Sequence, residues 1–193
     1  MYIETETTPN PASLKFLPQR EVMASGTREF ATPEAAEASP LAQAIFDTGE
    51  VTNVFFGSDF VSVTAAPGVS WTDLKPQVLA ILLDHFVSEA PLFAPGSAGG
   101  IAVPPEDAAM LVEERAEDEA IVAQINELLE TRVRPAVAGD GGDIQYRGFR
   151  DGVVYLQMQG ACSGCPSSTA TLKHGIEGLL KHYVPEVVEV RAA

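Results

Sequence analysis

Two cysteines stand close together near the end of the chain, in the sequence GACSGCPSST of residues 160–169, and they are the only cysteines of the protein. Thiolates bind metals and attack disulfides, so Cys162 and Cys165 are the residues of this sequence best suited to chemistry. A usual metal or cluster site takes four ligands, and one chain supplies only two thiols. The sequence therefore raises the question of where further ligands come from.

The residues around the pair predict the end of a strand before it and the start of a helix after it. Pro166 suits the first helical position, where free backbone N–H groups and the positive end of the helix dipole lie near the sulfurs. Both effects favour the thiolate form. Gly164 lets the loop fold back so that both sulfurs face the same way, and hydroxyl groups such as those of Ser163 and Thr169 offer hydrogen bonds to sulfur.

Three functional interpretations of the pair remain open at this point. The first is a thiol-disulfide oxidoreductase, because a C-x-x-C between a strand and a helix is also the thioredoxin arrangement, although the order of elements here does not build that fold. The second is a zinc-bridged dimer, but His85, His174 and His182 have no metal-type spacing to the cysteines. The third is a four-iron cluster held by two thiolates from each of two chains.

Composition and charge exclude some partners. The chain of 193 residues has a net charge of −15 and a pI near 4.4, so phosphate backbones and anionic membrane surfaces would repel it. We expect no nucleic-acid partner. The longest apolar runs, such as residues 78–83, are far shorter than the roughly 20 residues that span a bilayer, so we expect no membrane partner either.

The first residues, MYIETETTPNP, carry Glu4 and Glu6 where a signal or transit peptide would carry Lys or Arg. We therefore expect a reducing cytoplasm, in which a close cysteine pair favours metal binding or redox work over a structural disulfide.

The length predicts two small domains. The strand and helix patterns described below predict the α+β class for both. Residues 90–112 are rich in Pro, Gly and Ala without a sustained apolar period, which is typical of a flexible linker. We therefore predict domains over residues 1–89 and 113–193. Residues 1–112 hold 14 acidic and 4 basic side chains and carry the larger share of the negative charge.

The first domain shows strand patterns over residues 1–7, 13–17, 51–56 and 60–64, and helical patterns over 39–49 and 71–85. It contains no paired carboxylates, nucleophile elbow or phosphate loop.

The second domain is predicted to have the order αββαβ. A helix over about 116–133 ends at Pro135, the GDGGD of residues 139–143 forms a tight turn, and a hairpin follows with Arg150-Asp151-Gly152 at its tip. A second helix runs from the cysteine pair to Pro185, and residues 188–190 suggest a short last strand.

Residues 134–187, from RPAVAGDGGDIQYRGF through GACSGCPSST to HYVPEV, resemble the C-terminal domain of Nfu-type (NifU-like) iron-sulfur cluster scaffold and carrier proteins. The stretches TETTPNPASLKFLP and SPLAQAIFDTGEVTNVFFGSDFVSVT, with the W-x-x-L-K-P of residues 71–76, resemble the N-terminal domain of the two-domain members. Only the predicted linker lies outside the resemblance.

The resemblance implies a carrier rather than an enzyme. It implies that Cys162 and Cys165 of two chains bind one 4Fe-4S cluster in a homodimer. The cluster would come from upstream donors and pass to client apo-proteins, and the N-terminal domain would contact partners. Because an organellar member would carry a leader before this start, the resemblance points to a bacterial cytoplasm.

Overall fold

The computed structural model describes residues 2–97, 116–163 and 166–193, without the side chains of residues 116 and 166–168. The chain divides into two compact units, Met1–Ala102 and Val103–Ala193, which are described separately here. Each unit packs helices against its own antiparallel or mixed sheet, which confirms the predicted α+β class with two domains.

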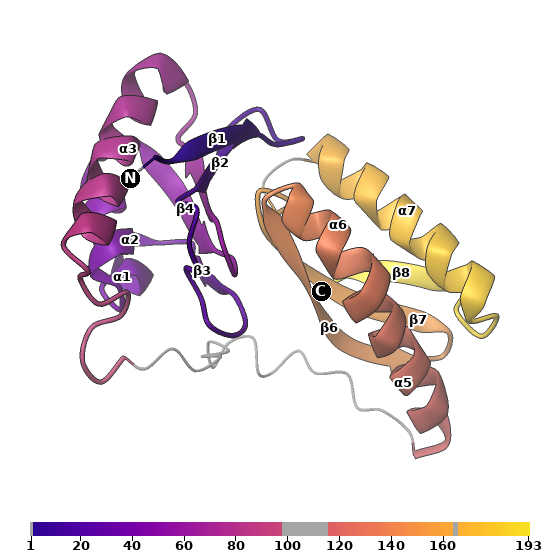
Figure 1. The fold of residues 1–193 in the computed structure, drawn as a ribbon. Helices are drawn as coiled ribbons and strands as arrows, with labels where there is room; N and C mark the ends of the chain where they lie inside the picture. Colours follow the sequence, from indigo (N-terminus) through magenta and orange to yellow (C-terminus); the bar gives the residue numbers. More distant parts are fainter. Residues whose placement is uncertain (1, 98–115, 164–165) are drawn as a thin grey trace. The chain divides into compact units, whose positions relative to one another are not determined.

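The N-terminal unit is built on a five-stranded antiparallel sheet in the order β1-β2-β5-β4-β3. Its strands are β1 (Glu4–Thr7), β2 (Ser13–Leu17), β3 (Arg28–Phe30), β4 (Val51–Phe56) and β5 (Val61–Ala65). The helices α1 (Pro33–Ala36), α2 (Pro40–Phe46) and α3 (Trp71–Val87) lie on one face of this sheet (Figure 1). The core of the unit lies between the two layers.

The predicted elements of this unit are confirmed, because their local signals are strong. Ser39 caps α2 by accepting a hydrogen bond from the N–H of Ala42, and Pro40 occupies the first turn. Ser70 caps α3 in the same way. β3 and α1 were not predicted from the sequence, since segments of three and four residues are too short to show a period.

Part of the segment predicted as linker packs on the N-terminal unit. Leu92 and Phe93 are partly buried against its core. Ser39 Oγ donates a hydrogen bond to the carbonyl of Leu92, and the N–H of Ala94 donates to the carbonyl of Ala38 at 2.9 Å. The rest of the predicted linker, residues 98–112, lies outside the described residues.

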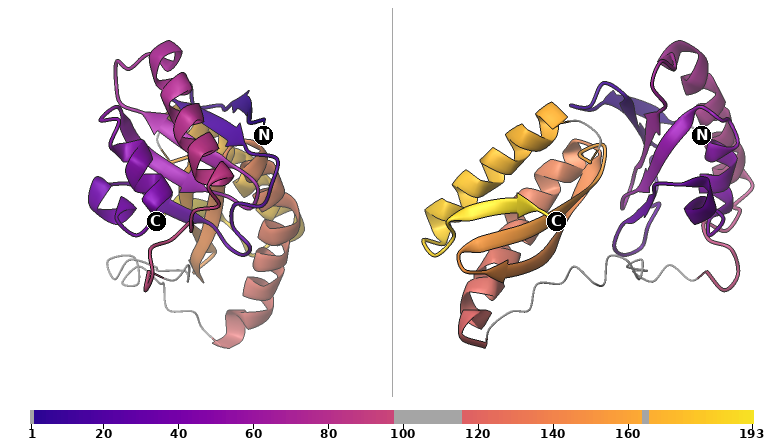
Figure 2. Two further views of the ribbon diagram at one scale, coloured as in Figure 1. Left: turned by 60° about the vertical axis from the view of Figure 1, so that its left-hand side comes forward. Right: turned by 180° about the vertical axis from the view of Figure 1, so that it is seen from behind.

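The C-terminal unit has the predicted order αββαβ. A helical run of α5 (Glu119–Leu128), η2 (Leu129–Val133) and α6 (Arg134–Gly139) leads into the hairpin of β6 (Gly142–Arg150) and β7 (Val153–Gly160), followed by α7 (Pro166–Tyr183) and β8 (Glu189–Ala192). The sheet order is β6-β7-β8, with β8 parallel to β7, so α7 is the crossover between them. The helices cover one face of this sheet (Figure 2).

Pro135 does not end the first helix of this unit, which is a correction to the prediction. The turn before it, Leu129–Val133, is a π-helix, and the N–H of Arg134 donates to the carbonyl of Leu129. The wider turn places Pro135 in the first turn of α6, where its missing N–H needs no partner. The run therefore continues to Gly139.

Among the described residues, no helix is both long enough and apolar enough to cross a bilayer.

Candidate functional site

Cys162 lies just after β7, at the point where the chain leaves the hairpin and turns toward α7. Cys165 lies outside the described residues. The predicted placement of the pair between a strand and a helix is therefore visible for Cys162, with Pro166 as the first residue of α7. Cys162 thus lies at the start of the connection that runs from β7 through α7 to the parallel strand β8.

Hydrogen bonds fix the backbone on both sides of Cys162. The N–H and the hydroxyl of Ser163 both donate to the carbonyl of Gly160, at 3.1 and 2.9 Å. The hydroxyl of Thr169 donates to the carbonyl of Cys162 at 2.8 Å and so links the first turns of α7 back to the cysteine. A hydroxyl has one proton to donate. The hydroxyls of Ser163 and Thr169 therefore donate to backbone carbonyls and not to a cysteine sulfur, as the sequence had led us to expect.

The Cys162 side chain points into the molecule. It is 6% exposed and belongs to the hydrophobic core of the C-terminal unit. Gly142, at the start of β6, lies directly against it: a Cβ at residue 142 would fall 2.8 Å from the Cys162 sulfur and 2.5 Å from the carbonyl oxygen of Gln159. The third glycine of the GDGGD segment, Gly142, is therefore a contact of the candidate site, whereas the sequence indicated only a tight turn.

The acidity of Cys162 differs from the sequence prediction. Burial raises the pKa of its thiol to about 12, and the negative charges of Asp140 and Asp143 act in the same direction. The start of α7 was expected to lower the pKa of this thiol, but desolvation has the larger effect and raises it. Burial of Cys162 therefore favours the protonated form of its thiol.

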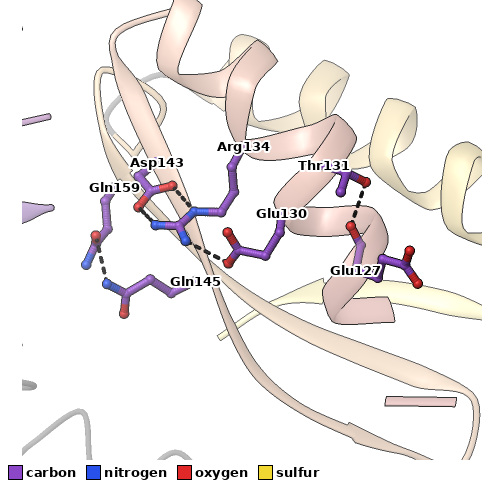
Figure 3. A network of polar contacts seen from close by, with 7 residues as sticks. All are labelled: Glu127, Glu130, Thr131, Arg134, Asp143, Gln145 and Gln159. Atoms are coloured by element: carbon purple, nitrogen blue, oxygen red, sulfur yellow. Dashed lines mark hydrogen bonds and ion pairs between the residues drawn. The ribbon is translucent and has the colours of Figure 1, made fainter. Parts of the chain in front are cut away.

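Asp143, the residue after Gly142, belongs to a charged network with Arg134 and Glu130 (Figure 3). Asp143 is 3% exposed and accepts two hydrogen bonds from Arg134, at 2.9 Å from Nε and 2.6 Å from Nη2. Arg134 also bonds Glu130 at 2.7 Å, on the exposed side of the helical run. These partners hold the pKa of the Arg134 guanidinium above its ordinary value. This ion pair was not predicted from the sequence, where the only signal for it is an acidic residue, Asp143, at the end of a glycine-rich turn.

The histidines weighed as zinc ligands do not gather at the cysteine. His174 and His182 are exposed on α7, and His85 is buried in the N-terminal unit. Within residues 2–97, 116–163 and 166–193, no group of three or more His, Cys, Asp or Glu side chains is arranged to hold a metal ion.

Two family profiles match the two units of the chain. The profile described as "Scaffold protein Nfu/NifU N terminal" matches residues 3–89, and the profile "NifU-like domain" matches residues 125–191. The chain belongs to the Nfu-type family of iron-sulfur cluster scaffold proteins, as the resemblance predicted. This family membership agrees with the expectation of a scaffold or carrier rather than an enzyme.

Relatives match over almost the whole chain. It is 50% identical to "NifU-like protein 4, mitochondrial" of Arabidopsis thaliana, covering 97% of this chain and 64% of the relative. It is 46% identical to the human "NFU1 iron-sulfur cluster scaffold homolog, mitochondrial", covering 97% of this chain and 70% of the relative. The chain thus spans about two thirds of the length of these relatives. The solution NMR structure of a NifU-like protein from Saccharomyces cerevisiae is 26% identical with a TM-score of 0.45, and the match covers 49% of this chain and 85% of that chain.

The expectation of a bacterial cytoplasmic protein is wrong on these comparisons. The plant, human and fly relatives that match at 44–50% identity all bear the names of mitochondrial proteins. The expectation rested on the composition of the first residues, and the relatives are longer than this chain, so that composition does not determine the compartment.

Proposed function

We propose that this protein carries an iron-sulfur cluster on Cys162 and Cys165 and delivers it to client apo-proteins. The observation that carries the proposal is the position of the cysteine motif: it begins the β7–α7 crossover of a NifU-like domain, and it contains every cysteine of the chain. Thiolates are the usual ligands of iron-sulfur clusters.

The cluster is of the 4Fe-4S type and is shared by two chains in this proposal. A cluster of this kind takes four cysteine ligands, whereas each chain has two cysteines. A two-fold dimer presents the same patch from both chains, so two copies of the motif would meet and complete the ligand set. One cluster is then bound per homodimer.

Delivery follows from the split ligand set. When the dimer opens, each chain keeps only half of the ligands, so client thiolates have open coordination positions to occupy. The N-terminal unit, the more acidic part of the chain, is assigned to contacts with clients or with the upstream donors that supply the cluster. Domain limits at residues 89 and 113 remain part of the proposal.

The test is anaerobic reconstitution with iron and sulfide, followed by size separation and analysis of iron, sulfide and protein in each fraction. We expect a brown dimer with about four irons and four sulfides per two chains. Cys162→Ser and Cys165→Ser are each expected to lose the cluster while keeping the circular dichroism spectrum. Ser163→Ala, a change between the two cysteines, is the matched control and should keep the iron.

Other outcomes separate the alternatives. A cysteine variant that retains full iron would remove that residue from the ligand set. A colourless dimer that retains zinc would favour the zinc-bridged module. A colourless monomer that reduces a disulfide substrate would favour the oxidoreductase.

A further inference from the structure

The Cys162 thiol is closed off in the structure, although the proposed function requires it to bind a cluster. Its side chain is 6% exposed and packs within the C-terminal core. A metal ligand has to be deprotonated and reachable by the incoming ion. Since this inference rests on the proposed function, the question is which part of the C-terminal unit covers the sulfur and what holds that part in place.

The cover is the turn that joins α6 to β6, residues 140–142. Gly142 is the part of this turn that lies against the sulfur, so close that even a methyl group would not fit between them. The turn meets the end of β7 through the N–H of Ala161, which donates to the carbonyl of Gly141 at 3.2 Å. Gly142 is also the strand partner of Gly160. Separating residues 140–142 from residues 160–162 would therefore uncover the thiol.

The ion pair of Arg134 and Asp143 brackets this turn. Arg134 precedes the turn on α6 and Asp143 follows it on β6, and two hydrogen bonds of 2.9 and 2.6 Å join them. A bidentate pair of this kind fixes both the distance and the orientation of its partners. Asp143 is buried, so losing the two hydrogen bonds from Arg134 would take a compensating positive charge away from a carboxylate that is shielded from water. The pair therefore ties the start of α6 to the start of β6, the two elements that the covering turn connects.

We infer that Arg134 and Asp143 form a clamp that positions the cluster ligand: while the clamp is closed, the turn shields Cys162, and local opening of the turn presents the sulfur to an incoming cluster. Arg134 is then a positioning residue for cluster uptake. The remainder of the C-terminal core stays folded during this opening.

Glu130 provides the internal comparison. It binds the same guanidinium at 2.7 Å, but its side chain is 62% exposed and it lies on the helical run, away from the covering turn. An exposed ion pair within one helix contributes little. A change at Glu130 should therefore alter the charge around Arg134 without releasing the turn.

The experiment uses the full-length, cluster-free chain with Cys165→Ser, so that Cys162 is the only thiol. The rate of alkylation by iodoacetamide reports exposure of the sulfur, and hydrogen exchange at the Ala161 amide reports separation of the turn. Arg134→Gln should accelerate both by about tenfold or more, because the opening free energy falls. Glu130→Gln should leave both rates near those of the parent.

Two further readouts distinguish local opening from other causes. Removing a positive charge raises the pKa of a nearby thiol, so an electrostatic effect alone would slow alkylation of Arg134→Gln rather than accelerate it. The amide of Val184, bonded to the carbonyl of Leu180 at 2.7 Å in the same unit, reports global unfolding and should exchange at the parent rate. Arg134→Lys keeps the charge without the bidentate geometry and should give intermediate rates; it decides the question if Arg134→Gln does not fold.

The inference is overturned if both Arg134 variants alkylate at the parent rate, or if the exchange of Val184 accelerates as much as that of Ala161. Failure of the proposed function is seen separately. In that case the chain with both cysteines takes up no iron and sulfide, whatever the alkylation rates of the variants are.

Discussion

At the scale of single residues, the packing around Cys162 leaves no room for a side chain at position 142. Gly142→Ala would place a methyl group 2.5 Å from the carbonyl oxygen of Gln159 and 2.8 Å from the sulfur of Cys162. Because backbone has to shift to accept it, we expect a loss of about 1–3 kcal/mol in the free energy of unfolding. The displaced turn should also weaken cluster binding. Denaturant unfolding and iron content measure the two effects.

The matched control for that change is Gly139→Ala, three positions earlier in the same glycine-rich segment. Gly139 is the last residue of α6, and a Cβ there would meet nothing within 4 Å. Alanine is the better helix former, so this variant should be neutral or slightly more stable. Equal destabilisation by both changes would contradict the steric explanation.

At the scale of elements, two opposing effects act on the pKa of His85 in the last turn of α3. His85 lies where the negative end of the helix favours a cation. Burial nevertheless lowers the pKa of His85 from its ordinary 6.5, Arg20 acts in the same direction, and Asp84 opposes them. The folded N-terminal unit therefore holds a neutral imidazole at a pH where the unfolded chain begins to bind a proton.

The consequence is a loss of stability in mild acid. Below pH 6.5 the unfolded state binds more protons at this residue than the folded state, so the free energy of unfolding falls as the pH decreases toward the lowered pKa. Trp71, the only tryptophan, packs against the N-terminal core and reports this unit by fluorescence. His85→Gln should flatten the decline in denaturant midpoint between about pH 7 and pH 5. His174→Gln, an exposed histidine of the other unit, should leave it unchanged.

The length of an element also depends on its context. The sequence predicted that Pro135 ends the first helix of the C-terminal unit, whereas the π-turn before it lets the run continue to Gly139. That continuation brings Arg134 and Asp143 together across the following turn. A break at Pro135 would have removed the support of the covering turn, so this difference bears directly on the candidate site.

At the scale of the whole molecule, each unit has a core of its own, and residues 90–97 belong structurally with the first. Leu92 and Phe93 are partly buried there, and Phe93 lies edge-on to Phe56 with ring centroids 6.4 Å apart. We therefore expect the fragment of residues 1–97 to unfold cooperatively and to be about 2–4 kcal/mol more stable than residues 1–89. Denaturant titration followed by Trp71 fluorescence compares the two; equal stability would show that residues 90–97 contribute nothing.

Local patterns determined much of this protein from the sequence. Alternating apolar residues and capping signals located most strands and helices, because they depend on neighbours a few positions apart. The motif GACSGCPSST identified the candidate site and, with the flanking stretches, the family. The short elements β3 and α1 were missed, since three or four residues are too few to show a period by themselves.

Only the tertiary structure decided the state of the site. The sequence placed Cys162 beside a helix start, which favours a thiolate, but the fold buries the sulfur against Gly142. Desolvation and the negative charges of Asp140 and Asp143 then raise the pKa of the thiol. The contact of Arg134 with Asp143 likewise depends on how α6 meets β6. Burial and the approach of one element to another are properties of the packed chain, and no spacing along the sequence encodes them.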